Sequence, residues 1–186
     1  CARGERDVGW DGGYAVYNWG LFFHAPLLIA DRLRQNQRFE EALTWFHYIF
    51  DPTDTSAEPS PQKYWRTKPF HQTTRADYAR QQIQKLFALL AEGRQDPDLV
   101  RQVAEWRRNP FHPHLIARLR PVAYQKHVVM RYLDTLIGWG DQLFRQARDP
   151  EQINQATQLY ILAADILGRR PDRMKPRVQP PVQTYN

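Results

Sequence analysis

The sequence is poor in cysteine and has no long apolar run. A single cysteine, Cys1, among 186 residues excludes an internal disulfide and any cysteine-rich zinc site. The longest apolar candidate, LFFHAPLLIA at residues 21–30, falls well short of the roughly 18–20 residues that a membrane-spanning helix needs. The chain starts at Cys1 instead of Met and no apolar h-region follows, so we expect it to be a piece of a longer protein whose targeting signal lies outside this sequence.

The signatures of common enzymes and of β structure are also missing. The sequence contains no HExxH, GxSxG, Walker A or glycine-rich dinucleotide motif. It shows no sustained alternation of apolar and polar residues, and no Asn-Gly or Asp-Gly turn between two apolar strands. These absences predict an all-α protein that is not an enzyme and needs no cofactor.

Apolar and aromatic residues are plentiful. Hydrophobic residues make up 42% of the chain and aromatic residues 13%, enough to build a sizeable core. The net charge of +6 is concentrated in residues 61–148, which hold sixteen Lys or Arg against seven Asp or Glu. This basic middle could bind nucleic acid or an acidic protein surface, or it could be a solvated, arginine-rich helical face.

Helical periodicity runs through most of the chain. We expect helices in residues 18–33, interrupted at Pro26, and in residues 39–50, with the short polar turn RQNQR between them making the two helices antiparallel. Residues 51–72 form a proline-rich crossing whose Tyr64, Trp65 and Phe70 we expect to lie on the helices. A further helix is predicted from Thr74 to Gly93, and another begins at Asp96.

Two long helices are predicted in the last third of the chain. The first spans residues 121–147, and the second, capped by Asp149, spans residues 150–167 and ends at Gly168. The residues expected to be buried on them are Val129, Leu133, Leu136, Ile137, Leu143, Phe144, Ile153, Ala156, Leu159, Tyr160, Ala163, Ile166 and Leu167.

The predicted fold is therefore all-α, built from antiparallel helix pairs as a helical bundle or a solenoid-like segment. We expect residues 1–13 to end a preceding region, residues 14–168 to form the helical domain, and the proline-rich residues 169–186 to begin an extended linker.

Histidines near prolines are the first candidate site. NPFHPH at residues 109–114 shares its middle, PFH, with residues 69–71, which places His71, His112 and His114 in similar loops. His112 and His114 are two apart on an extended stretch, so their side chains point to opposite sides and do not converge on a metal. We therefore interpret the three histidines as parts of turns. The alternative is a catalytic helical domain that uses these histidines.

A basic corner is the second candidate. Trp106, Arg107, Arg108, Arg118 and Arg120 flank the NPFHPH turn, and tryptophan and arginine often dominate protein interfaces. We predict that this corner contacts another subunit. The alternatives are a nucleic-acid-binding helical domain and an ordinary solvated face.

Long stretches of the chain resemble one known family. They are YNWGLFFHAPLLIADRL, QRFEEALTWFHYIFDPT, YWRTKPF, NPFHPHLIARLRPVAYQKHVVMRYLDTLIGWGDQLFRQ and INQATQLYILAADILG. In order, and over about residues 10–168, they are similar to the A component (TcA) of bacterial toxin complexes, the Tc or ABC insecticidal toxins. One departure is Gly20, where the family pattern leads us to expect an acidic residue.

The resemblance implies a structural role. In that family, five A subunits form a shell of helices around a channel, a pH shift releases the channel to enter the target membrane, and a separate B–C component carries the enzymatic toxin. The chain resembles the C-terminal part of the shell, just before the linker to the pore-forming channel. The implied protein is a secreted toxin particle, with no membrane span, metal or nucleic acid in this segment.

Overall fold

The computed structural model describes residues 15–74, 104–105, 107–109, 111 and 121–170. The predicted leading segment 1–13, the predicted helix that follows Thr74, most of the predicted helix that follows Asp96, and the linker from residue 171 onward lie outside these ranges. Within them the regular elements are helices, and β structure is limited to isolated bridges, such as the antiparallel one between Phe50 and Trp65. The predicted all-α class is confirmed.

The first helical rod is continuous but changes its hydrogen-bond pattern midway. It consists of α1 (Ala15–Trp19), the π-helix η1 (Gly20–His24) and α2 (Ala25–Gln35). Pro26 lies in the first turn of α2, where its missing amide costs little. The amide of Ala25 donates to the carbonyl of Gly20, a π-type bond that lets the rod continue into the new helix. The interruption predicted at Pro26 is therefore a change of helix type.

The second helix, α3 (Phe39–Phe46), runs back along α2 after a tight turn at Gln37, whose φ is 60°. The predicted helix reached Phe50, but α3 ends four residues earlier. Ile49 and Phe50 pair with the crossing segment instead: Arg66 N–H donates to the Ile49 carbonyl at 2.9 Å, and Asp51 N–H donates to the Tyr64 carbonyl at 2.8 Å. These two bonds take the backbone out of the helix before Asp51-Pro52 is reached.

The proline-rich crossing is anchored by its aromatic residues, as predicted. It contains a short 3-10 helix, η2 (Gln62–Tyr64), and α4 (Lys68–His71). Trp65 and Phe70 are buried in the core, and Tyr64 packs against it. Burying two large aromatic side chains gives this irregular segment enough apolar contact to hold one path across the helices.

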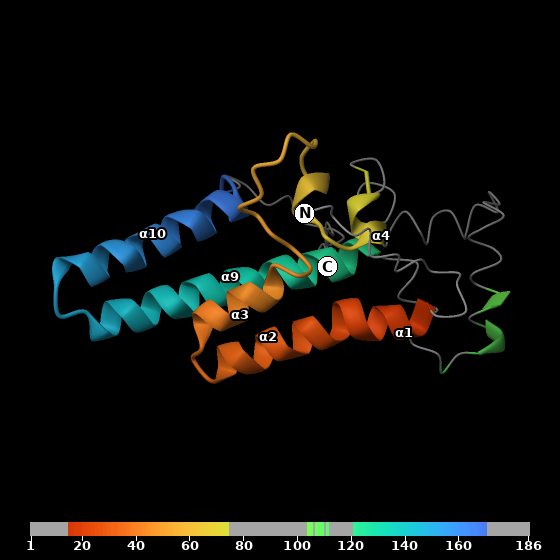
Figure 1. Ribbon diagram of the computed structural model, residues 1–186, viewed down its shortest axis with the longest axis horizontal. Coiled ribbons are helices and arrows are strands. Elements are labelled where there is room, and N and C mark those ends of the chain that lie inside the picture. Colours follow the sequence, from red (N-terminus) through yellow and green to blue (C-terminus); the bar gives the residue numbers. More distant parts are fainter. Residues whose placement is uncertain (1–14, 75–103, 106, 110, 112–120, 171–186) are drawn as a thin grey trace, which may run out of the picture.

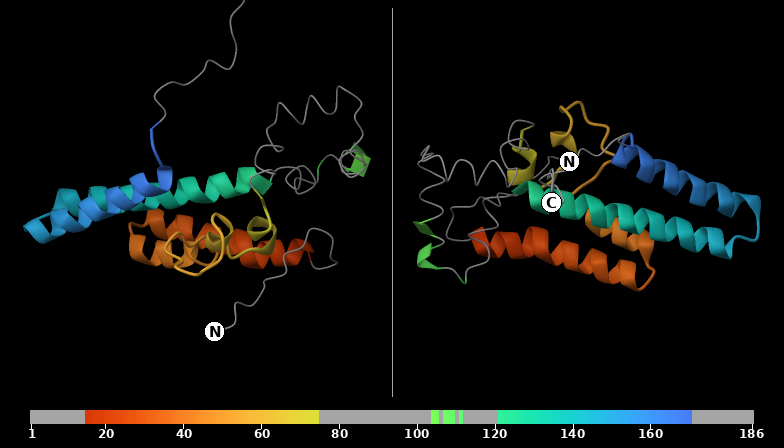
Figure 2. Two further views of the ribbon diagram at one scale, coloured as in Figure 1. Left: turned by 90° about the horizontal axis from the view of Figure 1, so that it is seen from above. Right: turned by 180° about the vertical axis from the view of Figure 1, so that it is seen from behind.

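The two long helices match their predicted bounds closely. They are α9 (Pro121–Gln146) and α10 (Pro150–Leu167), which pack antiparallel (Figure 1). The Asp149 side chain accepts a hydrogen bond from Gln152 N–H at 2.9 Å and caps α10, while Gly168, at a φ of 77°, ends it. Seen from above, α1, α2 and α3 lie in one layer and α9 and α10 in another (Figure 2).

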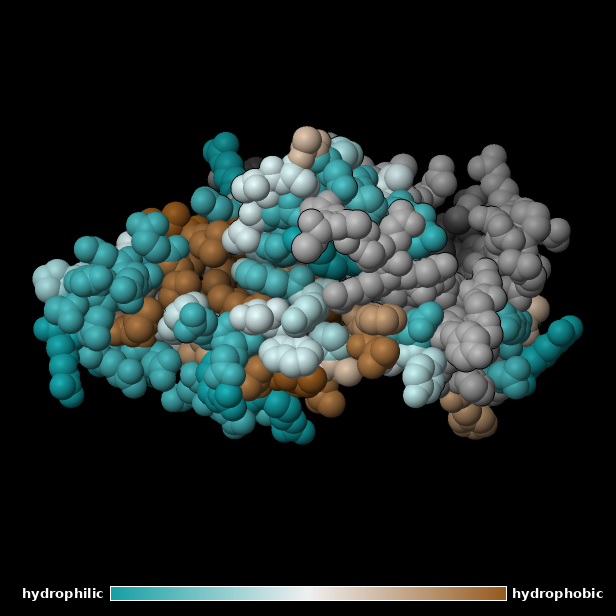
Figure 3. Space-filling view, in the orientation of Figure 1, coloured by the Kyte–Doolittle hydropathy of each residue, from teal (hydrophilic) through white to brown (hydrophobic). Residues whose placement is uncertain are grey.

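Part of the predicted buried face is wrong. Ile137 and Phe144 of α9, and Ile153 and Leu167 of α10, are exposed. The core side of α9 is formed by a neighbouring arc of the helix, with Val128, Tyr132, Leu133 and Leu136 buried there. Figure 3 shows apolar surface between α10 and α9 in the left half of the molecule. The α9–α10 pair therefore has more apolar surface than the rest of the described fold covers.

The core between the layers is mainly aromatic. Ring contacts run from Trp19 through Phe23, Phe70, Trp65 and Phe50 to Tyr132, with centroids 4.8–5.7 Å apart. Most of these pairs meet edge to face, the arrangement that the ring quadrupole favours. The chain of rings joins the first helical rod, the crossing and α9 into one core.

Candidate functional site

The predicted histidine site is described only at His71. This residue lies at the end of α4, and its Nε2 is 3.0 Å from a carboxylate oxygen of Glu58, with both side chains substantially exposed. Across the described ranges, no group of three or more His, Cys, Asp or Glu residues is placed to hold a metal ion. His112 and His114 lie outside those ranges. The structure therefore gives His71 a carboxylate partner that sequence reasoning did not anticipate.

The predicted basic corner is described only in part. Arg107 and Arg108 are exposed, whereas Trp106, Arg118 and Arg120 lie outside the described residues. Exposed arginines suit both an interface and a solvated face, so the subunit contact predicted for this corner stays a prediction.

A polar network that sequence reasoning missed joins the end of α3, the crossing and α9. His47 Nε2 lies 3.1 Å from the Tyr132 hydroxyl, and the two rings are nearly parallel, with centroids 5.8 Å apart. Close by, Arg66 donates to the Asp51 carboxylate at 2.6 Å and pairs with Asp54 at 2.8 Å. Arg66 thus ties the later part of the crossing to its beginning, where Asp51 and Asp54 lie.

Burial and charge set the ionisation of this network. Burial lowers the pKa of His47, the positive charge of Arg66 lowers it further, and the negative charge of Asp51 opposes both. Burial acts to raise the pKa of Asp51, but hydrogen bonds from Thr53 and Arg66 outweigh it and hold that pKa below its usual range. Burial also raises the pKa of Tyr132. At neutral pH the network therefore contains a neutral imidazole, a neutral phenol and an ionised carboxylate.

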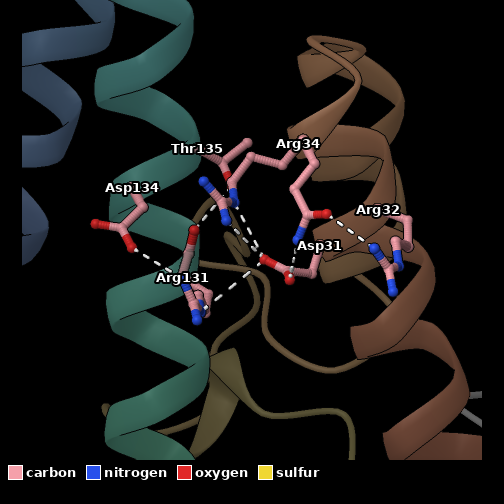
Figure 4. A network of polar contacts seen from close by, with 7 residues as sticks. Asp31, Arg32, Arg34, Arg131, Asp134 and Thr135 are labelled. Carbon is pink, nitrogen blue, oxygen red and sulfur yellow. Dashed lines mark hydrogen bonds and ion pairs between the residues drawn. The ribbon is translucent and has the colours of Figure 1, made fainter.

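A second network ties α2 to α9 (Figure 4). Asp31 on α2 accepts hydrogen bonds from Arg34 at 2.9 Å and Gln35 at 2.8 Å. Arg131 on α9 lies 4.0 Å from Asp31 and 3.7 Å from Asp134 on its own helix. Burial acts to raise the pKa of Asp31, but the hydrogen bond and charge of Arg34 and the charge of Arg131 outweigh it and lower that pKa.

Both networks are arranged to hold elements together. Asp31, Asp51 and Asp54 each face an arginine, and His47 meets a tyrosine hydroxyl. A general base or nucleophile needs a free acceptor aimed at a place where substrate can bind. In these networks the carboxylates are occupied by cations, which suits interlocking of helices better than proton transfer to a substrate.

Sequence reasoning missed the contact between His47 and Tyr132 because the two residues are 85 positions apart. The one local signal is that His47 directly follows the buried Phe46 at the end of α3. A histidine at the edge of an apolar helix face needs a polar partner, but the sequence does not say which residue supplies it.

None of the described helices is both long and apolar enough to cross a membrane.

Comparisons with known proteins point to one kind of protein. No model of a known protein family matches the chain. The chain is 28% identical over 166 residues, or 87% of its length, to Toxin subunit YenA2 of Yersinia entomophaga. Its structure is similar to the cryo-EM structure of Yersinia pseudotuberculosis TcaA-TcaB, with a TM-score of 0.57 and 26% identity over 88% of the chain.

Both relatives are far longer than this chain, which spans 10% of the length of YenA2 and 8% of the matched TcaA-TcaB chain. The match nevertheless runs over almost all of the 186 residues, in both sequence and structure. The resemblance drawn from the sequence is thereby confirmed at the level of a Tc toxin component, and this chain is similar to one segment of such a component.

Proposed function

We propose that this chain is a structural segment of the pore-forming translocation subunit of a Tc toxin, and that it forms part of the helical shell around the channel. The observation that carries the proposal is the match with Toxin subunit YenA2 over 87% of the chain. Residues 14–168 form the shell domain, and residues 169–186 begin the linker to the channel. The segment itself is not an enzyme and binds no cofactor.

The packing supports a shell role. A protective shell has to stay rigid under load. The described layers are joined by an aromatic core and by the ionic contact between Arg131 and Asp31, and Arg66 holds the crossing together through Asp51 and Asp54. Buried aromatic rings and partly buried ion pairs resist shear between helices more than exposed pairs do. The carboxylates of both networks are paired with arginines, and no specific observation on the described residues favours the catalytic or the nucleic-acid-binding alternative.

The resemblance extends the proposal to assembly. Five subunits enclose the channel, the particle also binds the B–C component, and the assembled particle is secreted. We propose that the basic corner, with Trp106, Arg107, Arg108, Arg118 and Arg120, contacts a neighbouring subunit. Replacing Arg107 and Arg108 by Glu in the full-length subunit should reduce the fraction of assembled particles seen by electron microscopy. Unchanged assembly would remove the corner from the interface.

The shell role can be tested by loosening the core in the full-length subunit. Leu136 is fully buried between the layers, so Leu136→Ala should weaken the shell, whereas Glu40→Ala on the exposed side of α3 should not. Dye release from liposomes would be followed as the pH is moved away from neutrality. The proposal predicts release closer to neutral pH for Leu136→Ala only. Release profiles that are the same in both variants and in the unmodified subunit would contradict it.

A further inference from the structure

Helix α10 is more apolar than its packing requires. In this 18-residue helix only Ala156 and Ala163 are fully buried, and its main packing partner is α9. Its large apolar side chains, by contrast, are partly or largely exposed: Ile153, Leu159, Tyr160, Ile161, Leu162, Ile166 and Leu167. These side chains span about half of the helix circumference, a wider stripe than contact with α9 alone buries.

The exposed residues form two rows that run side by side. Met130, Ile137 and Phe144 are seven residues apart on α9, and Ile153, Tyr160 and Leu167 are seven apart on α10. Residues at this spacing lie on nearly one line along a helix. We call these six residues the apolar seam. Apart from the half-buried Tyr160, they are exposed by 41–63%.

A close contact fixes how the two rows are aligned. Gly140 meets the Tyr160 ring, because a Cβ added at Gly140 would lie 2.8 Å from that ring, and the Tyr160 hydroxyl donates to Asp141 at 2.7 Å. Because the helices are antiparallel, this contact sets Phe144 near the level of Ala156 and Ile137 near the level of Ala163, so each residue of one row lies within about one helical turn of a residue of the other row. The rows therefore border one shallow apolar surface on the side of the pair where Tyr160 reaches over to Asp141.

The carboxylates beside the seam have partners within the pair. Asp141 accepts the Tyr160 hydrogen bond, and Asp134 lies 3.7 Å from Arg131. These carboxylates would repel a phosphate backbone. A surface with two apolar rows fits the apolar stripe of another helix, as in ordinary helix packing.

We propose that the apolar seam is the docking surface for an amphipathic helix from another part of the same toxin polypeptide, outside these 186 residues. From Met130 to Phe144 the seam is about 21 Å long, which corresponds to about 14 residues of a docked helix. The inference rests on the proposed function in taking the chain as one segment of a longer subunit. The relatives support this source, since nine-tenths of their length lies outside the segment that this chain matches.

A helix on the same polypeptide is favoured over a second copy of the chain. A tethered segment reaches an effective concentration in the millimolar range, far above the concentration of free subunits. A second copy would have to bind this small apolar surface without any ionic contact from the seam. Its affinity would therefore be too low to displace a tethered helix. The experiment therefore has to distinguish a docked helix of the same chain from contact between two copies through the seam.

The test is site-specific photo-cross-linking in the full-length subunit. Phe144→p-benzoylphenylalanine places the reactive group on the seam with little change of shape, and Tyr48→p-benzoylphenylalanine is a matched control at an exposed aromatic residue away from it. Mixing isotope-labelled and unlabelled subunits distinguishes links within one chain from links between chains. We expect position 144 to link to a peptide of the same chain outside residues 1–186, and Ile153→Asp to reduce that link at least tenfold.

Three results would overturn the inference: links from position 144 to a second copy, links confined to residues 1–186, or no links above those of position 48. If the variant at position 144 does not fold, Ile137→Cys supplies a second measurement. Its thiol should react at least tenfold more slowly in the native full-length subunit than in the unfolded one, and equal rates would refute the inference. Neither the cross-linking nor the thiol reactivity depends on pore formation. A failure of the proposed shell function would therefore be distinguished from a failure of this inference.

Discussion

The close approach of α9 and α10 at Gly140 makes a sharp prediction about a single methyl group. In Gly140→Ala the new Cβ would lie 2.8 Å from the Tyr160 ring, closer than such atoms approach in proteins. Either the ring moves and its hydroxyl loses Asp141, or the two helices separate slightly. Alanine has a higher helix propensity than glycine, which by itself would stabilise the variant. Because of the clash with Tyr160, the free energy of unfolding of Gly140→Ala should be lower than this propensity gain alone predicts.

A matched substitution isolates the packing term. Gly20→Ala makes the same chemical change in a helical segment where nothing lies within 4 Å of the added Cβ. Replacing glycine by alanine inside a helix gains about 1 kcal/mol from propensity, and this gain is similar in both variants. Overpacking costs typically about 1–3 kcal/mol, and Tyr160 is only half-buried and can yield, so the lower half of that range applies. We expect Gly140→Ala to be less stable than Gly20→Ala by about 1–2 kcal/mol.

Urea unfolding followed by circular dichroism would measure both free energies of unfolding. Tyr160→Leu removes the ring, so Gly140→Ala made in that background should lose its penalty and become neutral or stabilising. If Gly140→Ala and Gly20→Ala changed the free energy of unfolding equally, the packing of α9 on α10 through Gly140 would be refuted.

Four further outcomes follow from single features of the fold. Leu136→Ala should lower the free energy of unfolding by about 2–5 kcal/mol in urea titrations, since Leu136 is fully buried, and a loss below about 0.5 kcal/mol would place that residue outside the core. Asp149→Ala removes the cap of α10 and should cost about 0.5–2 kcal/mol, with Asp149→Ser nearly neutral as its control. The pKa of His47 is lowered by burial, so the folded state binds fewer protons than the unfolded state, and stability present above pH 6.5 should be lost as the pH falls below it. In His47→Gln the urea midpoint should depend less on pH over this range. If its dependence on pH were unchanged, His47 would not be the group responsible for the loss of stability. Deleting residues 172–186 should leave the melting temperature nearly unchanged, because that tail is proline-rich and nearly without apolar residues, and a fall of many degrees would show that it packs on the domain.

The features that could be predicted are those encoded by neighbouring residues. The start of α10 follows from Asp149 and Pro150, a cap and a first-turn proline, and its end follows from Gly168. The bounds of α9 and the anchoring of the crossing by Trp65 and Phe70 follow from similarly local patterns. Each of these signals acts within one turn of helix or one loop.

The features that were missed depend on contacts between distant parts of the chain. The end of α3 at Phe46 is set by the pairing of Phe50 with Trp65, fifteen positions later. Ile137 and Phe144 have the right spacing for a buried stripe, but periodicity does not say which of two adjacent arcs of α9 faces the core. The partners of His47 and Asp31 lie on α9, some 85 and 100 residues away, so the polar networks could not be derived from sequence spacing.

The measurement that tests the central claim most directly is a cryo-EM reconstruction of the assembled full-length subunit. We predict that residues 14–168 lie in an all-helical outer wall around the channel, with the seam at Ile137 and Phe144 covered by another helix of the same polypeptide. We also predict that residues 169–186 lead from this wall toward the channel. Density that places residues 14–168 in the lining of the channel, or in a separate domain with an open catalytic pocket, would contradict the proposed function.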